Sequence, residues 1–561
     1  MKQSVRVRLK AAGAAFASNA VNGNLRRAQL SFFGAWTAEW AFTVGLGIVA
    51  YRAGGPTAVG LVGLLRMVPS AVIAPLAAPL ADRGRRERVL VLVSTVRGLA
   101  TGAAGIVVAL NGPVMIVYIL AALSTIAATL FRPAHSALLP SLCRTGHELA
   151  SANVVRGMLD SIATLVGALL AAALLEFTDV AGVFAFASAA SLAAAALLLG
   201  MRYDAPPRPA APRGAHLMAD VAEGVRAIMG NRDLALLTGL GMAQTFTRGA
   251  LTVFTVVVAL DLLHTGEPGV GTLTGAIGAG AVLGSLIASL LVGSRWLAQW
   301  FGIGVALWGL PIALIPLFPW EATALTLLAC VGIGNALVDV GLFTLMARLA
   351  PDAVLARVFG LFESLITLAV GVGAIVASLL IEWTSLTAAL IIVGALCPCL
   401  VLVAWRRLRH LDRYIGELDK EIGLLQGVPM FQPLPAIEQL ARGLEPVHVP
   451  VGQAVFRQGD PADRFYVIES GTVDVIGDGH LITTLGPGEG FGEIGLLRRV
   501  RRTATVRAAS DLELQALPCN RFLPVVTGFP PSSREAGAEV EELLDRFSPG
   551  ELPDDQNGAR H

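Results

Sequence analysis

Up to about residue 405 the chain is a succession of long apolar runs, and this pattern restricts its fold more than any other feature. A helix needs roughly 20 residues to cross the ~30 Å hydrocarbon core of a bilayer. Twelve runs meet that length, and their centres lie near Phe42, Ala71, Leu99, Leu123, Val166, Ala190, Phe254, Gly284, Leu310, Gly332, Val370 and Val393. Only 15% of the residues are charged, against roughly 25% in soluble proteins. The sequence therefore predicts a polytopic α-helical membrane protein with 12 transmembrane helices, and it excludes a wholly soluble enzyme.

Lys and Arg gather in alternate loops, which predicts how the chain is oriented in the membrane. Cytoplasmic loops of membrane proteins carry an excess of these two residues. One side of this chain holds basic clusters at residues 2–10, 83–88 and 406–409, whereas the opposite loops, apart from Arg52, are acidic. We therefore expect a multi-pass protein of the cell (inner) membrane with both termini in the cytoplasm.

Two similar segments indicate that the membrane part is an internal duplication. Asp160-Ser161 opens the fifth predicted span and Glu363-Ser364 opens the eleventh, and each pair follows a Gly three residues before the acid. Two parallel six-helix halves are typical of secondary transporters. The predicted organisation is an N-terminal cytoplasmic segment at 1–27, six-helix halves at 28–201 and 234–405, a loop at 202–233, a linker helix at 406–427, a soluble domain at 428–547 and a disordered tail at 548–561.

The loop between the second and third predicted spans carries a recognisable motif. It reads Ala78-Pro-Leu-Ala-Asp-Arg-Gly-Arg-Arg-Glu-Arg88. This resembles the major facilitator signature Gly-x-Leu-x-Asp-Arg-x-x-Arg-x-Arg, with Ala78 where Gly is usual. The resemblance covers about residues 28–405, and several further segments are similar to the drug and siderophore exporter branch. It implies a major facilitator fold and says nothing of the substrate.

The charges of this motif can also serve as a gate. Arginines in the loop are able to pair with acids near the cytoplasmic ends of the fifth and eleventh spans, and such a latch would hold one of two conformations. The residues concerned are Asp82, Arg83, Arg86, Arg88, Asp160 and Glu363. The alternative is that the positive charges only keep the loop in the cytoplasm.

Several ionisable or polar residues fall inside predicted spans, where a charge is costly unless it faces a cavity or a partner. They are Glu39, Arg248, Asn335 and Asp339. The family resemblance implies that their spans line a central cavity, so Glu39, Arg248 and Asp339 are expected to meet there. We therefore predict a substrate and proton cavity, with proton-coupled export of a small amphipathic or hydrophobic molecule. The alternative is a static ion pair.

A heptad pattern follows the last predicted span. Apolar residues at 408, 411, 415, 418, 422 and 425 recur with spacings of three and four residues, which is the a/d pattern of a coiled coil. Three roles remain open for this helix. It can form a homodimer, dock onto the membrane domain, or dock onto the soluble domain of its own chain.

The soluble part gives the most specific signal. Short alternating segments near 465–468 and 473–476, joined by a turn at Gly471, predict a β-barrel or roll. The segment Gly486-Pro-Gly-Glu-Gly-Phe-Gly-Glu-Ile-Gly-Leu-Leu497, followed by Arg501-Arg-Thr-Ala504, resembles the phosphate-binding cassette of cyclic-nucleotide-binding domains. The residues that match the cassette are Gly492, Glu493, Ile494, Arg502, Thr503 and Ala504. The resemblance implies a cytoplasmic β-roll with flanking helices.

These residue types suit a cyclic nucleotide chemically. Free N–H groups after Gly492 can hold a phosphate, and Arg502 offers a bidentate fork for its oxygens. Glu493 can accept from the ribose 2′-OH. Thr503 can donate to the phosphate or, by the resemblance, contact a guanine amino group. We expect cAMP or cGMP as a regulatory ligand, with cAMP favoured, and no metal.

The prediction as a whole is a secondary transporter regulated by a cyclic nucleotide. Its expected partners are a small-molecule substrate, the nucleotide and membrane lipid. Nucleic acid is not expected, because 42 basic and 41 acidic residues nearly cancel. An enzyme is not expected either, since the sequence has no nucleophile–base set, metal cluster or P-loop. The alternatives are a non-transporting membrane receptor for cyclic nucleotides and a lipid or lysophospholipid flippase on the same fold.

Overall fold

The computed structural model describes residues 21–83, 85–143, 146–201, 217–291, 296–349, 355–432 and 437–528, and three positions beyond them, 532, 537 and 538. Most of the predicted N-terminal segment, the first part of the loop at 202–233, the tail at 548–561 and the side chains of Asp82 and Arg83 lie outside the described residues. The chain divides into two compact units, which are described separately. Unit 1 is Met1–Leu411 and unit 2 is Asp412–His561.

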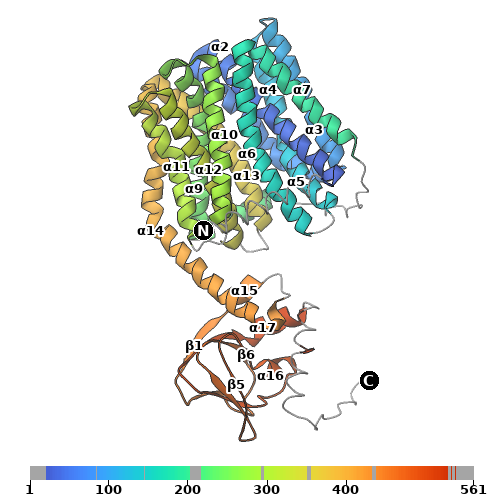
Figure 1. The fold of residues 1–561 in the computed structure, drawn as a ribbon, viewed down its shortest axis with the longest axis vertical. Helices are drawn as coiled ribbons and strands as arrows, with labels where there is room; N and C mark the ends of the chain where they lie inside the picture. The colour runs from blue at the N-terminus through green and yellow to red at the C-terminus, as the bar shows by residue number, and fades with distance from the viewer. Residues whose placement is uncertain are drawn as a thin grey trace. The chain divides into compact units, whose positions relative to one another are not determined.

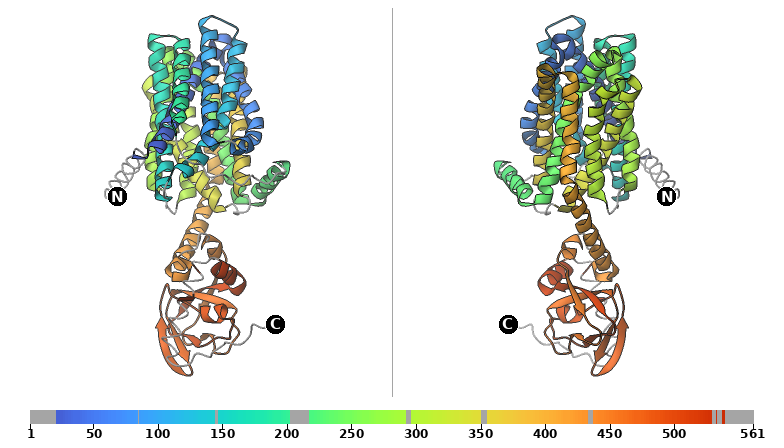
Figure 2. Two further views of the ribbon diagram at one scale, coloured as in Figure 1. Left: turned by 90° about the vertical axis from the view of Figure 1, so that its right-hand side faces the viewer. Right: turned by 90° about the vertical axis from the view of Figure 1, so that its left-hand side faces the viewer.

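Unit 1 is built of long helices that run alongside one another (Figure 1). A shorter helix, α8, lies at an angle to them at one of their ends (Figure 2). The helices are α2 (Gly23–Arg83), α3 (Arg86–Ala109), α4 (Val114–Thr129), α5 (Phe131–Leu142), α6 (Gly146–Phe177), α7 (Val180–Leu199), α8 (Leu217–Gly230), α9 (Arg232–Val257), α10 (Gly266–Leu291), α11 (Leu297–Leu314), α12 (Glu321–Leu349), α13 (Leu355–Trp383) and α14 (Leu386–Gly427), with a π-helical turn at Val258–Leu262 and a 3₁₀ turn at Ile315–Leu317.

Within the described ranges, eleven helices are long and apolar enough to cross a membrane. The first candidate, Gly23–Ile73, has 51 residues, which at ~1.5 Å per residue is about 77 Å and more than twice the hydrocarbon thickness. The backbone leaves helical geometry at Gly54 and Gly55, where Gly55 has a φ of +62°. Only Gly adopts that conformation without strain. The predicted spans around Phe42 and Ala71 therefore lie on opposite sides of a break in α2.

Small residues let the helices of unit 1 pack closely. A Cβ atom on Gly280 of α10 would lie 1.8 Å from the Ala329 carbonyl oxygen of α12. One on Gly332 of α12 would lie 2.0 Å from the Ile277 carbonyl oxygen of α10. Close backbone approach of this kind drives helix association where lipid removes the hydrophobic contribution. The high Gly content of the apolar runs is thus explained by packing between helices.

Unit 2 contains two antiparallel four-stranded sheets with orders β1-β8-β3-β6 and β2-β7-β4-β5. The strands are β1 (Glu445–Val449), β2 (Ala454–Phe456), β3 (Arg464–Ser470), β4 (Val473–Gly477), β5 (His480–Leu485), β6 (Gly490–Phe491), β7 (Thr505–Ala508) and β8 (Leu512–Pro518). Three short helices, α15 (Ile437–Ala441), α16 (Glu493–Leu497) and α17 (Cys519–Gly528), and a 3₁₀ turn at Pro429–Phe431 complete it. This arrangement agrees with the predicted roll.

Strand β3 is buried on both faces because two apolar clusters meet on it. Phe465 and Val467 pack with the helices of unit 2, whereas Tyr466 and Ile468 pack between the sheets. Successive side chains of a strand point to opposite faces. The continuous apolar run Phe465-Tyr-Val-Ile468 therefore fits a central strand of the roll.

The heptad residues are buried within the chain itself. Leu408 contacts Gly302 of α11 in unit 1, and Leu418 and Leu425 belong to the apolar cluster of unit 2. Leu408, Leu411, Ile415, Leu418 and Leu425 are all at most 5% exposed. The burial of these five residues favours docking onto the chain's own domains, whereas Ile422 is partly buried. A homodimer through this helix stays a prediction.

Candidate functional site

The predicted cassette residues surround one cavity of unit 2 with a volume of about 640 Å³. Cavities of a few hundred Å³ are typical small-molecule sites. Gly492, Glu493, Ile494, Arg502, Thr503 and Ala504 all line it. They come from the start of α16 with the residue before it, and from the segment before β7. Hydrogen bonds from the Arg502 Nη1 to the Gly492 carbonyl oxygen and from the Val500 N–H to the Gly495 carbonyl oxygen join the two segments. The six residues that match the cassette in the sequence therefore meet at one place.

Arg502 is the buried cation of this cavity, with its side chain 2% exposed. Its Nη1 donates to the Gly492 carbonyl oxygen at 2.9 Å, and its Nη2 donates to the Arg464 carbonyl oxygen at 2.7 Å. Nη2 also pairs with the Asp463 carboxylate at 3.3 Å. Its Nε is buried and has no acceptor among the described residues. A buried donor of this kind favours an anionic ligand.

Two aromatic rings hold the Arg502 guanidinium in place. Its Cζ lies 4.1 Å from the centre of the Phe456 ring and 5.9 Å from that of Tyr466. Burial lowers the pKa of Arg502, although nearby Tyr466, Asp463 and Glu493 counteract the shift. An arginine stays charged under such a shift, since its usual pKa is above 12. The cavity therefore keeps a fixed positive charge.

Gly492 and Glu493 shape the wall opposite Arg502. Gly492 has a φ of +93°, and a Cβ atom there would lie 2.6 Å from the Arg502 Nη1. Only glycine fits this position on both counts. Glu493 is 4% exposed and starts α16. Because α16 has only five residues, most of the attraction for an anion comes from Arg502.

Sequence reasoning missed three parts of the cavity wall. Phe456 lines it from β2, and residues 482–485 of β5 line it together with Val475 of β4. Gly427, Val428 and Pro429, at the end of α14 and the turn after it, also line it. The strand residues are ordinary alternating positions, and the α14 end belongs to a segment that the sequence assigns to a linker. No motif marks either of them.

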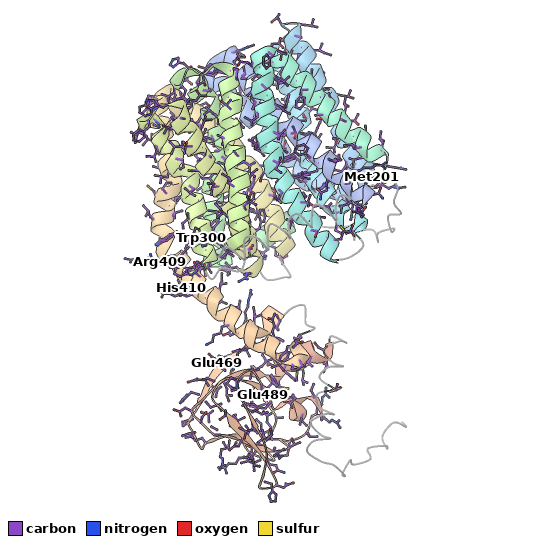
Figure 3. All side chains as sticks on the ribbon, viewed as in Figure 1. Met201, Trp300, Arg409, His410, Glu469 and Glu489 are labelled. Atoms are coloured by element: carbon purple, nitrogen blue, oxygen red, sulfur yellow. The ribbon has the colours of Figure 1, made fainter. Side chains whose placement is uncertain are left out.

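The last turns of α14 are tied to β3 by an ion pair. Lys420 donates to the Glu469 carboxylate, which also accepts from the Gln515 amide at 2.8 Å. Figure 3 labels Glu469 on the roll, together with Glu489, whose carboxylate accepts from the Gly486 N–H. The hydrogen bond from Lys420 holds the pKa of Glu469 below its usual value. This pair is largely exposed, so its contribution to stability is small.

We predict a pH dependence from this pair. A carboxyl whose folded pKa is depressed stabilises the fold above its unfolded pKa, and this stabilisation is lost as the pH falls through the folded pKa. Lys420→Met should therefore lower the unfolding temperature of unit 2 slightly at pH 7, and the difference between variant and wild type should be smaller at pH 3. Calorimetry of the full chain at both pH values measures this. An equal difference at the two pH values would contradict it.

In unit 1, Glu39 does not meet Arg248 and Asp339, which corrects the prediction from the sequence. Its carboxylate pairs with the Arg97 Nη2 at 2.5 Å and with the Arg66 Nη2 at 3.0 Å. Both arginine side chains are at most 7% exposed. Arg66 also donates to the Thr125 hydroxyl at 2.8 Å. The rotation of α2 and α3 brings Glu39 to these arginines, so it belongs to a buried structural network.

A second charged group contains the other predicted cavity residues. Asn335 donates to the Asp339 carboxylate at 3.0 Å on α12, and Asp339 interacts electrostatically with Arg248 of α9. Arg132 of α5 pairs with Asp160 of α6 at 3.2 Å, and both act on Arg248. The Arg132 guanidinium also lies 4.5 Å from the centre of the Trp36 ring. Charges from both predicted halves therefore face one another here, with Arg132 and Asp160 in place of Glu39.

The predicted gate has different contacts in this structure. Arg86 donates to the Ala137 carbonyl oxygen of α5, Arg88 is exposed, and Asp160 pairs with Arg132. Glu363 acts on Arg248 from α13. Asp160 lies about fourteen residues into α6, farther along the helix than the loop that holds Arg86 and Arg88. Arg132 of α5 is therefore the arginine within reach of its carboxylate.

Polar contacts at the other ends of the helices join α2 to helices of the second predicted half. Arg52 forms two hydrogen bonds of 2.6 Å with Glu267 of α10. Thr57 donates to Glu382 of α13 at 3.0 Å, and Tyr51 donates to Asp261 in the π-helical turn. These bonds link the two sets of helices at the end where the sequence places the acidic loops.

Two family models match the chain. One described as Major Facilitator Superfamily matches residues 29–293, and one described as Cyclic nucleotide-binding domain matches residues 446–527. Among the described residues no group of three or more His, Cys, Asp or Glu side chains is placed to hold a metal ion.

Curated relatives match part of the chain. An uncharacterised protein of Mycobacterium tuberculosis is 37% identical over 113 residues, which is 19% of this chain and 22% of that protein. A cAMP-dependent protein kinase regulatory subunit of Eremothecium gossypii is 46% identical over 74 residues, which is 13% of this chain and 16% of that protein. The match thus spans about a fifth or less of these relatives.

Solved structures give partial matches as well. The regulatory domain of Toxoplasma gondii PKA with cAMP is 23% identical with a TM-score of 0.20, covering 24% of this chain and 50% of that one. The catabolite activator protein of Thermus thermophilus is 28% identical with a TM-score of 0.20, covering 21% and 59%.

Proposed function

Because the chain joins a Major Facilitator Superfamily domain to a C-terminal cyclic nucleotide-binding domain, we propose that it is a secondary membrane transporter controlled by a cyclic nucleotide. Regulation by a nucleotide is supported by the cavity of unit 2, where six cassette residues surround a space of about 640 Å³. A buried Arg502 with an unsatisfied Nε–H supplies the charge that a cyclic phosphate needs. The nucleotide is a regulatory ligand and is not transported.

We assign cAMP as the preferred nucleotide. Part of this chain is 46% identical over 74 residues to a protein named as a cAMP-dependent protein kinase regulatory subunit. Glu493 lies in the cavity wall, where it is able to accept from the ribose 2′-OH. Thr503 lines the same cavity and is able to donate to the phosphate. cGMP is the competing ligand, because the same hydroxyl suits a guanine amino group.

The transport cavity contains the second charged group of unit 1. Arg132, Asp160, Arg248 and Asp339 interact with one another, and charges within membrane helices mark substrate or proton pathways. We assign proton-coupled export of a small amphipathic or hydrophobic molecule to this group, with Asp339 as the proton carrier. Glu39 has no part in the cavity, since two buried arginines occupy its carboxylate.

The chain lies in the cell (inner) membrane with twelve crossings and both termini in the cytoplasm. Support comes from the break in α2, which divides a 51-residue candidate into two segments, and from the alternation of basic and acidic loops. The bonds of Arg52, Thr57 and Tyr51 then hold the outer end closed in the described conformation. A transporter alternates between this form and one in which these bonds are broken.

Flux into inverted vesicles tests this proposal. Vesicles with wild-type protein should take up amphipathic fluorescent cations when a proton gradient is applied, and cAMP should change the rate. Asp339→Asn should remove the dependence on the gradient while leaving cAMP binding intact. Absence of gradient-driven flux with every substrate of the panel, in protein that binds cAMP, would favour a membrane receptor over a transporter.

A further inference from the structure

The nucleotide cavity has a wall that does not belong to the roll. Gly427, Val428 and Pro429 line the same space as Gly492 and Arg502. Gly427 is the last residue of α14, a helix that runs without a break from Leu386. The same helix contains the last candidate membrane span.

Buried side chains hold residues 427–430 against the apolar cluster of unit 2. Val428 and Met430 are at most 1% exposed and belong to the apolar cluster of unit 2, whereas Gly427 and Pro429 are exposed. Val428 and Met430 therefore anchor the segment, while Gly427 and Pro429 contribute to the wall of the cavity. A shift of the last turn of α14 would move this part of the wall.

Gly427 stands closely against the turn that precedes the cassette. A Cβ atom on Gly427 would lie 3.3 Å from the Gly488 carbonyl oxygen, and Gly488 lines the cavity too. Gly423, one turn earlier in α14, is exposed and would have no atom within 4 Å of a Cβ. The two glycines thus share a helix and differ in whether a side chain would meet the site.

We propose that the end of α14, residues 427–429, is a second contact surface for the bound nucleotide, so that occupancy of the cavity fixes the position of the last turn of α14. The inference rests on the proposed function of the cavity. It adds that the last turn of α14 responds to whether a nucleotide is bound there. Nucleotide binding and the position of this turn are therefore thermodynamically linked. If nucleotide binding changes the equilibrium between two positions of the turn by a given factor, the nucleotide affinities of those two positions differ by the same factor.

A pair of glycine variants in the full-length chain tests this inference. Gly427→Leu fills the cavity from the α14 side and should weaken cAMP binding, measured by calorimetry, by about tenfold or more. The matched variant Gly423→Leu adds the same side chain outside the cavity and should bind within about twofold of wild type. Wild-type affinity in Gly427→Leu would overturn the proposal.

Hydrogen exchange on the wild-type chain gives an answer even where Gly427→Leu does not fold. Adding cAMP should slow exchange of the amides of residues 424–428, and unchanged exchange there would overturn the proposal. If wild-type protein does not bind cAMP at all, the proposed function of the cavity fails. If it binds, Arg502→Ala does not bind, and Gly427→Leu binds normally, only the present inference fails.

Discussion

Arg502→Ala should lose cAMP binding by about 30-fold or more, because truncating one partner of a buried charge pair costs about 2–5 kcal/mol and each 1.4 kcal/mol is about tenfold. The guanidinium is the buried cation among the residues that line the cavity, and its Nε has no acceptor among the described residues. Calorimetry of the purified full-length chain with cAMP measures the loss.

Two further variants separate charge from geometry. Arg502→Lys keeps the charge and loses the planar fork, so its affinity should lie between those of wild type and Arg502→Ala. Arg507→Ala removes an exposed arginine on β7 that does not line the cavity, and it should bind as wild type does. Equal affinity in Arg502→Ala and Arg507→Ala would contradict the assigned site.

Glu39→Gln should strongly destabilise the membrane unit. The substitution leaves the buried guanidinium groups of Arg66 and Arg97 without their shared carboxylate. Breaking a buried ion pair by removing one partner costs about 3–5 kcal/mol. The unfolding temperature of the full-length chain in detergent should therefore fall by many degrees. The exposed control Glu176→Gln should leave it unchanged.

A double variant shows whether the charge network is the cause. Glu39→Gln combined with Arg97→Met removes one of the two uncompensated charges, so it should be more stable than Glu39→Gln alone. A Glu39→Gln chain that unfolds at the wild-type temperature but no longer responds to the proton gradient would reverse our assignment. Glu39 would then be a proton carrier.

The nucleotide cavity was predictable because its chemistry is local in sequence. Gly492 and Arg502 are ten residues apart, and the conformation of Gly492, which leaves no room for a Cβ beside Arg502, explains why glycine is needed at that spacing. The short segments at 465–468 and 473–476 similarly predicted strands of a roll, and β3 and β4 contain them. In both cases the residues that determine the local structure are neighbours in the sequence, so their spacing or alternation is enough to predict it.

The partners of the membrane charges were not predictable in the same way. Glu39, Arg66 and Arg97 lie on three predicted spans, and whether their side chains meet depends on the rotation of each span about its own axis. The family resemblance implied a meeting of Glu39 with Arg248 and Asp339, whereas the packing of α2 against α3 and α4 gives Glu39 other partners. Apolar runs specify the length of a span and leave its rotation open.

The end of α14 illustrates a third case. The heptad seam predicted a linker helix at 406–427, and in the structure this stretch is the last part of a helix that runs from Leu386 to Gly427. The change from lipid-facing to heptad pattern alters the partners of the helix without interrupting its hydrogen bonds. Composition therefore indicated a boundary where the backbone has none.

The central claim is that a nucleotide bound in unit 2 changes the conformation of the membrane helices. Hydrogen–deuterium exchange of the full-length chain in lipid nanodiscs, with and without cAMP, tests it without knowledge of the substrate. We predict altered exchange beside the break in α2, at the start of α10 and at the end of α13, where Arg52, Glu267 and Glu382 lie, and no such change in Arg502→Ala. Changes confined to residues 412–528 in nucleotide-bound protein would contradict the account.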